Sequence, residues 1–241
     1  WHTQGLPAEV DSTEEVERYF GLDRGFETNL VNYWGDDGPI GLLWRAYPPF
    51  SKIKLSETES TITYGGEVGL IIEHKGSETI PRQEKFVVES FEDFSQKITP
   101  ERFNAWDPGR ITPEFVSMME RAKKEGQPVG MWIDGFLAWP RELMGIENLS
   151  YMYYDDPELI HAIQRQHVDF VKEFVKMTLT KIPMQYACFF EDMCYKNGCL
   201  ISPKIFEEFM APYYDELLSF LRSNGIEKIL VDSDGNSVEL T

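Results

Sequence analysis

Two acidic pairs stand directly after apolar runs of the sequence. One pair follows residues 184–190, and the other surrounds residue 233, just after the run 229–231. Carboxyl groups that share one site repel each other when ionised, so either the pKa of at least one rises or a cation binds. A carboxyl group that keeps its proton can act as a general acid toward a leaving oxygen or nitrogen atom. Our candidate catalytic residues are Asp232, Asp192, Glu191 and Asp234.

A second interpretation gives these acids a local structural role. Aspartate commonly caps helices and closes turns, and Asp234-Gly235-Asn236 is also a turn signature. Both interpretations remain open from the sequence.

Aromatic residues surround the end of another apolar run, residues 128–133. Their faces can hold a methylated ammonium group or the flat face of a cofactor, although they can equally pack a core. The candidate substrate-binding residues are Asp134, Trp132, Phe136, Trp139 and Asn236.

The three cysteines, Cys188, Cys194 and Cys199, are predicted to be reduced and structural. Their number is odd, and their spacing does not match a common tetrahedral zinc motif. His161 and His167 are six residues apart, a poor spacing for one face of a helix, so we do not expect them to be ligands.

The elements that must position these residues alternate between helix and strand after residue 111. Helices are predicted over 112–125, 139–145, 156–181 and 202–224, the last kinked at Pro212, and strands over 128–133, 184–190 and 228–231. This alternation is typical of parallel βα units. No glycine-rich loop follows a strand to favour an open dinucleotide-binding sheet.

The first 110 residues differ in character. A short helix is predicted over 11–21, and β-rich runs at 60–64 and 68–74 are separated by Gly65-Gly66, which indicates an antiparallel hairpin. Residues 90–110 are predicted to be a polar connection. We therefore expect residues 1–110 to form a helical and β-hairpin extension of the βα units in 111–241.

Composition limits the classes of function. The chain has 241 residues, 42% hydrophobic and 14% aromatic, which is enough for a large core. With 41 acidic and 23 basic residues, its formal charge is −18, which disfavours nucleic acid and substrates with many carboxylates. No apolar stretch is long enough to span a membrane, and the chain opens without a signal core, so a cytoplasmic protein is expected.

Several segments resemble the uroporphyrinogen decarboxylase (URO-D) superfamily. The weaker matches are Gly5-Leu6-Pro7, residues 141–145 (Arg-Glu-Leu-Met-Gly) and residues 154–160, which open the long helix. The more specific ones are Glu191-Asp192-Met193, residues 201–204 (Ile-Ser-Pro-Lys), residues 209–213 (Phe-Met-Ala-Pro-Tyr) and residues 231–236 (Val-Asp-Ser-Asp-Gly-Asn), in this order and spacing.

The resemblance implies an α/β fold of the TIM (β/α)8 type with its active site at the C-terminal ends of the strands. The alternating part of the chain is too short for eight strands, so we expect this barrel to be incomplete at the C-terminus. The arginine-rich segment of true decarboxylases has no match here. The resemblance is therefore closer to the corrinoid-linked methyltransferases, with uroporphyrinogen decarboxylation as the alternative and a non-catalytic, ligand-binding barrel as a second alternative.

A zinc site is not favoured. The methyltransferases that activate thiols carry a His-x-Cys-Gly motif where this chain has Asp232-Ser233-Asp234-Gly235. Carboxylates suit a harder cation, a cationic substrate or proton transfer better than thiol activation by zinc. Whether a metal binds is left open. The expected partners are a small-molecule substrate and a corrinoid-binding protein, and a homodimer is also left open.

Overall fold

The computed structural model describes residues 5–22, 30–31, 45–76 and 81–240, and all structural statements concern these residues. The helices are α1 (Thr13–Phe20), α2 (Phe91–Lys97), α3 (Pro113–Lys124), α4 (Ala138–Met144), α5 (Ile146–Asp155), α6 (Pro157–Leu179), α7 (Pro203–Phe209) and α8 (Ala211–Ser223), with a short 3-10 helix, η2 (Pro108–Arg110). The strands are β1 (Leu30–Val31), β2 (Lys52–Glu57), β3 (Thr61–Gly66), β4 (Leu70–His74), β5 (Arg82–Lys85), β6 (Gly130–Asp134), β7 (Tyr186–Phe190), β8 (Cys194–Tyr195), β9 (Gly198–Cys199) and β10 (Lys228–Asp232).

A four-stranded parallel sheet forms the centre of the molecule. Its strand order is β1-β6-β7-β10, and every neighbouring pair is parallel. All five residues of β6 are buried, as expected for a strand covered on both faces. The described strands do not close into a cylinder, because β1 and β10 are the two edges of the sheet. The fold class is thus α/β, and the closed barrel remains a prediction.

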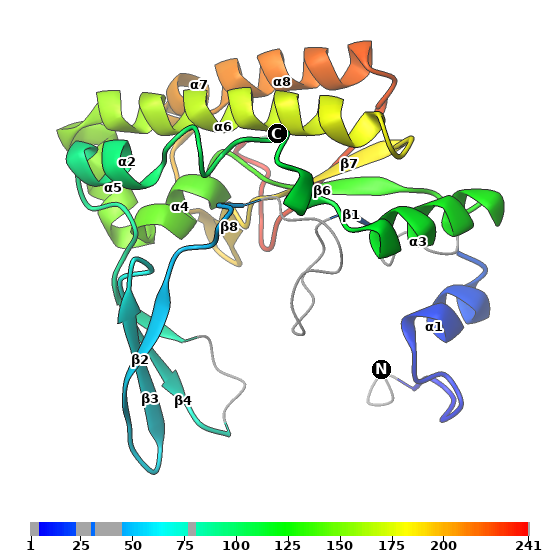
Figure 1. The fold of residues 1–241 in the computed structure, drawn as a ribbon, viewed down its shortest axis with the longest axis horizontal. Helices are drawn as coiled ribbons and strands as arrows, with labels where there is room; N and C mark the ends of the chain where they lie inside the picture. The colour runs from blue at the N-terminus through cyan, green and yellow to red at the C-terminus, as the bar shows by residue number, and fades with distance from the viewer. Residues whose placement is uncertain (1–4, 23–29, 32–44, 77–80, 241) are drawn as a thin grey trace.

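Alternating side chains of the strands face two different apolar regions. Ala187 and Phe189 belong to the main core, together with buried side chains of α6 and α8. Trp132, Tyr186 and Cys188 form a second, smaller cluster on the other face of the sheet. In Figure 1, α6 and α8 form a layer above this sheet.

The long helix α6 begins where its sequence signals predicted. The Asp156 side chain accepts a hydrogen bond from the Leu159 N–H, and Pro157 occupies the first turn. Its apolar stripe supplies a large share of the main core.

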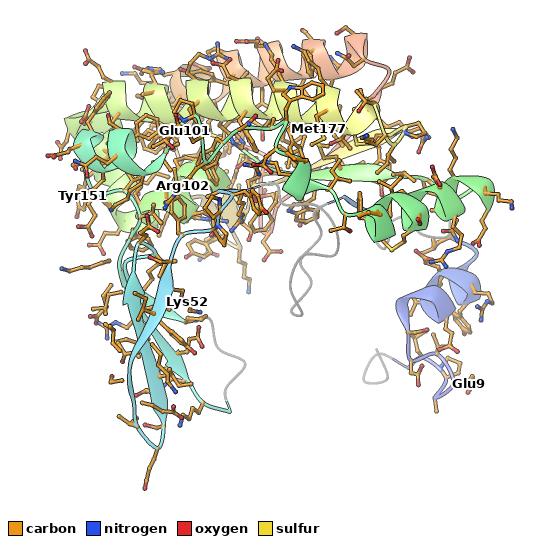
Figure 2. All side chains as sticks on the ribbon, viewed as in Figure 1. Glu9, Lys52, Glu101, Arg102, Tyr151 and Met177 are labelled. Carbon is orange, nitrogen blue, oxygen red and sulfur yellow. The ribbon has the colours of Figure 1, made fainter. Side chains whose placement is uncertain are left out.

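A second sheet, of strand order β2-β3-β4-β5, is antiparallel throughout. The predicted pairing of the two β-rich runs is therefore confirmed. This sheet projects away from the helical layer (Figure 1), and Figure 2 shows Lys52 on it and Arg102 above it, in the main body. An ion pair of 2.6 Å between Arg102 and Glu67 links the sheet to that body.

Three local predictions need correction. Residues 202–224 form two helices that meet at Met210, and Pro212 lies in the first turn of α8, where its missing N–H is tolerated. The supposed connection at 90–110 contains α2, capped by Ser90, and η2. The turn between β3 and β4 follows Gly66, since Gly65 and Gly66 end β3 itself.

No helix in the described residues is long and apolar enough to cross a membrane.

Candidate functional site

Three of the predicted acids meet at the carboxyl end of the parallel sheet. The register places Asp232 of β10 beside Phe190 of β7, one residue before Glu191-Asp192. The Asp232 carbonyl accepts hydrogen bonds from the N–H groups of Glu191 (2.9 Å) and Asp192 (3.5 Å). The Asp192 carboxylate accepts a 3.2 Å bond from the Asp234 N–H. Asp192, Asp232 and Asp234, termed here the acidic rim, therefore lie together.

Burial and neighbouring charges at the acidic rim raise the pKa of Asp232. The pKa of Asp232 is raised by partial burial, and further by the negative charges of Asp192 and Asp234. The Asp232 side chain remains exposed to solvent, so a substrate can reach it. The backbone of Asp192 has φ of 49°, a left-handed conformation that is uncommon for a residue other than glycine. Such conformations cluster at functional sites.

Glu191 has a different environment from the rim. It is fully buried, and its carboxylate accepts hydrogen bonds from the backbone N–H groups of Phe136 (2.7 Å), Leu137 (2.8 Å) and Ala138 (3.0 Å) and from the Tyr214 hydroxyl. Burial raises the pKa of Glu191, while these four donors favour the ionised form and oppose that rise. Its oxygens bind donors of the protein, which gives it a role in positioning the turn after β6. The catalytic role expected from the sequence stays a prediction.

The turn between β6 and α4 is shaped around this carboxylate. A Cβ atom at Gly135 would lie 2.1 Å from the carboxyl carbon of Glu191, so only glycine leaves room there. The turn therefore ties the carboxyl end of β6 to that of β7, and the Glu191 charge lies against the N-terminus of α4, where a negative charge is favoured.

Asp134, at the end of β6, lies in the same row of the sheet as Phe190 and Asp232. Its side chain is buried, and both of its oxygens accept from the Arg45 guanidinium, at 3.1 and 3.2 Å. Arg45 also contacts Glu142 at 3.4 Å. The charge of Asp134 is thus balanced within the protein. Arg45 had no local sequence signal, because its partner is 89 positions away.

Trp132 and Phe190 stack on the face of the sheet that carries Asp232. Their ring centroids are 5.7 Å apart and the planes differ by 25°. The Arg141 guanidinium lies 5.5 Å from the Phe190 ring centroid and donates a 3.3 Å hydrogen bond to the Asp192 carbonyl. Trp132 therefore lies below the rim, buried against an aromatic partner, and its contact with a substrate stays a prediction.

Phe136 and Trp139 lie in the main core instead. Both are buried; Trp139 stacks on the His167 ring, and Phe136 packs edge-to-face against Tyr214. His167 is buried and its Nε2 bonds the Asp134 carbonyl at 2.7 Å, while burial lowers its pKa to about 4. Packing, the alternative interpretation of these aromatic residues, accounts for their positions. The substrate-binding role expected for Phe136 and Trp139 stays a prediction.

Asn236 belongs to the turn that carries Asp234. Its backbone N–H donates to the Tyr195 carbonyl at 3.0 Å, and its side-chain oxygen accepts from the Val238 N–H at 3.2 Å. Ser233 accepts a 2.9 Å bond from the Met193 N–H. The turn is thus held against the β8–β9 hairpin, which sequence patterns did not indicate.

The donor set of the rim does not fit a thiol-activating zinc ion. The rim contributes carboxylates, whereas such zinc sites use thiolate and imidazole. In the part of the chain that the structure describes, no group of three or more His, Cys, Asp or Glu side chains is arranged to hold a metal ion.

Polar residues gather at the carboxyl end of a parallel α/β sheet, which is where the active sites of α/β barrel enzymes lie. The sequence model described as uroporphyrinogen decarboxylase (URO-D) matches residues 63–236, a range that begins within β3 and includes the whole acidic rim. The chain belongs to the uroporphyrinogen decarboxylase family, whose members are generally enzymes. No curated protein matches the chain.

Proposed function

We propose that this protein is a methyltransferase or demethylase that moves a methyl group from a small methylated substrate to a corrinoid carried by a partner protein. The proposal includes a site at the acidic rim, a cytoplasmic setting and the TIM barrel that the family implies. Its main support is the convergence of Asp192, Asp232 and Asp234 on one end of the sheet, with the pKa of Asp232 raised.

The chemistry assigned to the rim is proton donation. When a methyl group leaves an ether oxygen, the electron pair of the broken C–O bond stays on that oxygen, which then needs a proton. Asp232, whose pKa is raised by partial burial and by its acidic neighbours, supplies that proton as a general acid, and the product is an alcohol or phenol. The reduced corrinoid, as second substrate, accepts the methyl group.

The remaining groups orient the substrate. Trp132, which is buried below the rim against Phe190, is the aromatic group assigned to an aryl ring or a methylated ammonium group of the substrate. Asp192 and Asp234 supply negative potential that attracts a cationic substrate and repels a polyanionic one. The net charge of −18 acts in the same direction.

Uroporphyrinogen decarboxylation is the second candidate function. The family description and two arginines near the rim, Arg45 and Arg141, favour it. However, Arg45 contacts two carboxylates, and Arg141 donates to the Asp192 carbonyl. These contacts leave little positive charge to hold several substrate carboxylates, which ranks this reaction second.

A panel assay separates these functions. Purified protein is incubated with methylated amines or aryl methyl ethers and reduced corrinoid, and separately with uroporphyrinogen. Methylated corrinoid in the first assay supports the proposal. Decarboxylated porphyrinogen in the second assay alone would overturn it, and tight ligand binding without turnover in either assay would identify a binding protein.

The role of Asp232 is tested on the ether substrate that turns over. Asp232→Asn cannot donate the proton, so kcat is expected to fall by about 100-fold or more. Asp215→Asn, on the exposed surface of α8, is the matched control and should keep wild-type activity. Retained kcat in Asp232→Asn would remove this residue from the mechanism.

A further inference from the structure

Two cysteines face each other across the β8–β9 hairpin, beside the acidic rim. Cys194 pairs with Cys199 in the antiparallel register, and Tyr195 pairs with Gly198, so the connection contains only Lys196 and Asn197. The Cys194 thiol donates to the Cys199 sulfur over 2.9 Å. Both thiols are free in this structure.

This geometry is compatible with a disulfide bond. Residues directly opposite on antiparallel strands have Cβ atoms roughly 4.5–5.5 Å apart, and a disulfide needs roughly 3.5–4.5 Å. A small rotation of two side chains whose sulfur atoms are already 2.9 Å apart closes the remaining gap. The third cysteine, Cys188, lies in the cluster with Trp132 and Tyr186 and pairs with neither.

We propose that Cys194 and Cys199 form a reversible dithiol–disulfide site that reacts with low-molecular-weight disulfides such as glutathione disulfide. The proposal is independent of the reaction assigned to the rim. It replaces the structural role that the sequence suggested for these two residues.

The exposure of the two thiols sets the order of the steps. Cys199 is partly exposed, whereas Cys194 is buried, and burial together with the Cys199 contact raises the pKa of Cys194 to about 12. The Cys199 thiolate therefore attacks the external disulfide first and forms a mixed disulfide, with release of one small thiol. Cys194 then loses its proton, attacks the Cys199 sulfur and releases the second small thiol.

The exchange is balanced. Two protein S–H bonds and one external S–S bond become one protein S–S bond and two external S–H bonds. The protein dithiol loses two electrons, and the external disulfide gains them. The high pKa of Cys194 slows the second step, but its position beside Cys199 makes that step intramolecular.

The site is connected to the turn that carries Asp234. The Cys199 sulfur contacts the Asn236 carbonyl at 3.5 Å, and the Asn236 N–H donates to the Tyr195 carbonyl at 3.0 Å. A Cβ atom at Gly235 would lie 2.6 Å from the Cys194 carbonyl oxygen, which shows how closely turn and hairpin pack. Oxidation of the pair therefore acts on a hairpin that supports the rim.

The test measures free thiols and intact mass of the whole chain in buffers of increasing glutathione disulfide. The reduced protein should show three reactive thiols when unfolded and the oxidised protein one, since only Cys188 remains. Intact mass should fall by two hydrogens, and peptide mapping should link Cys194 to Cys199. Dithiothreitol should restore all three thiols.

Two variants complete the test. Cys188→Ser should still lose two thiols, whereas Cys199→Ser should form no internal disulfide and add no glutathione at Cys194. Three free thiols in the folded wild-type protein at the highest glutathione disulfide concentration would overturn the proposal. A disulfide that includes Cys188, or a stable glutathione adduct without the internal bond, would also overturn it.

Discussion

At the scale of single residues, Asp232 combines exposure with a raised pKa. Its neighbours Asp192 and Asp234 are both acidic, and no hydrogen bond between the side chains of the three is recorded in the described structure. Repulsion between these carboxylates lowers the stability of the folded protein. Groups that serve catalysis commonly lower stability in this way.

This cost predicts a pH-dependent effect of Asp232→Asn on stability. The pKa of Asp232 is higher in the folded protein than in the unfolded chain. The free energy of unfolding of the wild-type protein therefore falls as pH rises through the folded-state pKa and Asp232 loses its proton. The variant should therefore unfold at a higher temperature than wild type at pH of about 7, and the difference should vanish below pH of about 4.

The measurement is thermal unfolding of both proteins across this pH range, with Asp215→Asn as the control. A variant that is less stable than wild type at neutral pH would show that Asp232 is held by favourable contacts, contrary to this account.

Residue types and spacing predicted that the acids meet at one edge of the sheet, but not the different environments of their side chains. Each acidic pair follows an apolar run that could be recognised as a strand, so their meeting at one sheet edge could be inferred. Glu191 and Asp192 are adjacent in sequence, yet one is buried and the other partly exposed. That difference depends on Tyr214 and the turn at Gly135, which are distant in sequence.

At the scale of elements, Glu191 joins β7 to the start of α4. Glu191→Ala would leave three backbone N–H groups and the Tyr214 hydroxyl without this acceptor in a buried site. Since each unsatisfied buried donor costs about 1–3 kcal/mol, the free energy of unfolding should fall by about 3 kcal/mol or more.

Urea unfolding measures this loss. Glu207→Ala, on the exposed surface of α7, is the control and should change stability by less than about 0.5 kcal/mol. A loss below about 1 kcal/mol in Glu191→Ala would mean that water or another group replaces the carboxylate, and the positioning role would be lost.

Elements with strong local signals were predicted well. The capped helix α6 and the buried strands β6 and β7 were expected close to their observed bounds. Helix α5, helix α2 and the β8–β9 hairpin were missed. Helix α2 has no buried side chain, and the two strands of the hairpin have two residues each. The shortest of these segments give too few repeats for hydrophobic periodicity to detect.

At the scale of the whole molecule, the formal charge of −18 is the dominant feature. Excess negative charge destabilises the folded state through self-repulsion, and salt screens that repulsion over about 10 Å at 0.1 M. Surface ion pairs, such as that between Lys54 and Glu57, are exposed to solvent and add little to the stability of the folded state.

The unfolding temperature at neutral pH should therefore rise as NaCl is increased from about 10 mM to about 200 mM. KCl should act equally, because screening does not depend on the identity of the cation. A decrease with either salt would mean that specific ion pairs outweigh the net repulsion.

The central claim is that Asp192, Asp232 and Asp234 interact at one rim, so that the pKa of Asp232 is raised. An NMR titration of the Asp232 carboxyl carbon tests it most directly, in wild type, Asp192→Asn and Asp215→Asn. We predict an Asp232 pKa above the ordinary aspartate value of about 4, a lower value in Asp192→Asn and no change in Asp215→Asn. A pKa at or below the ordinary value in wild type, unaffected by Asp192→Asn, would contradict the account.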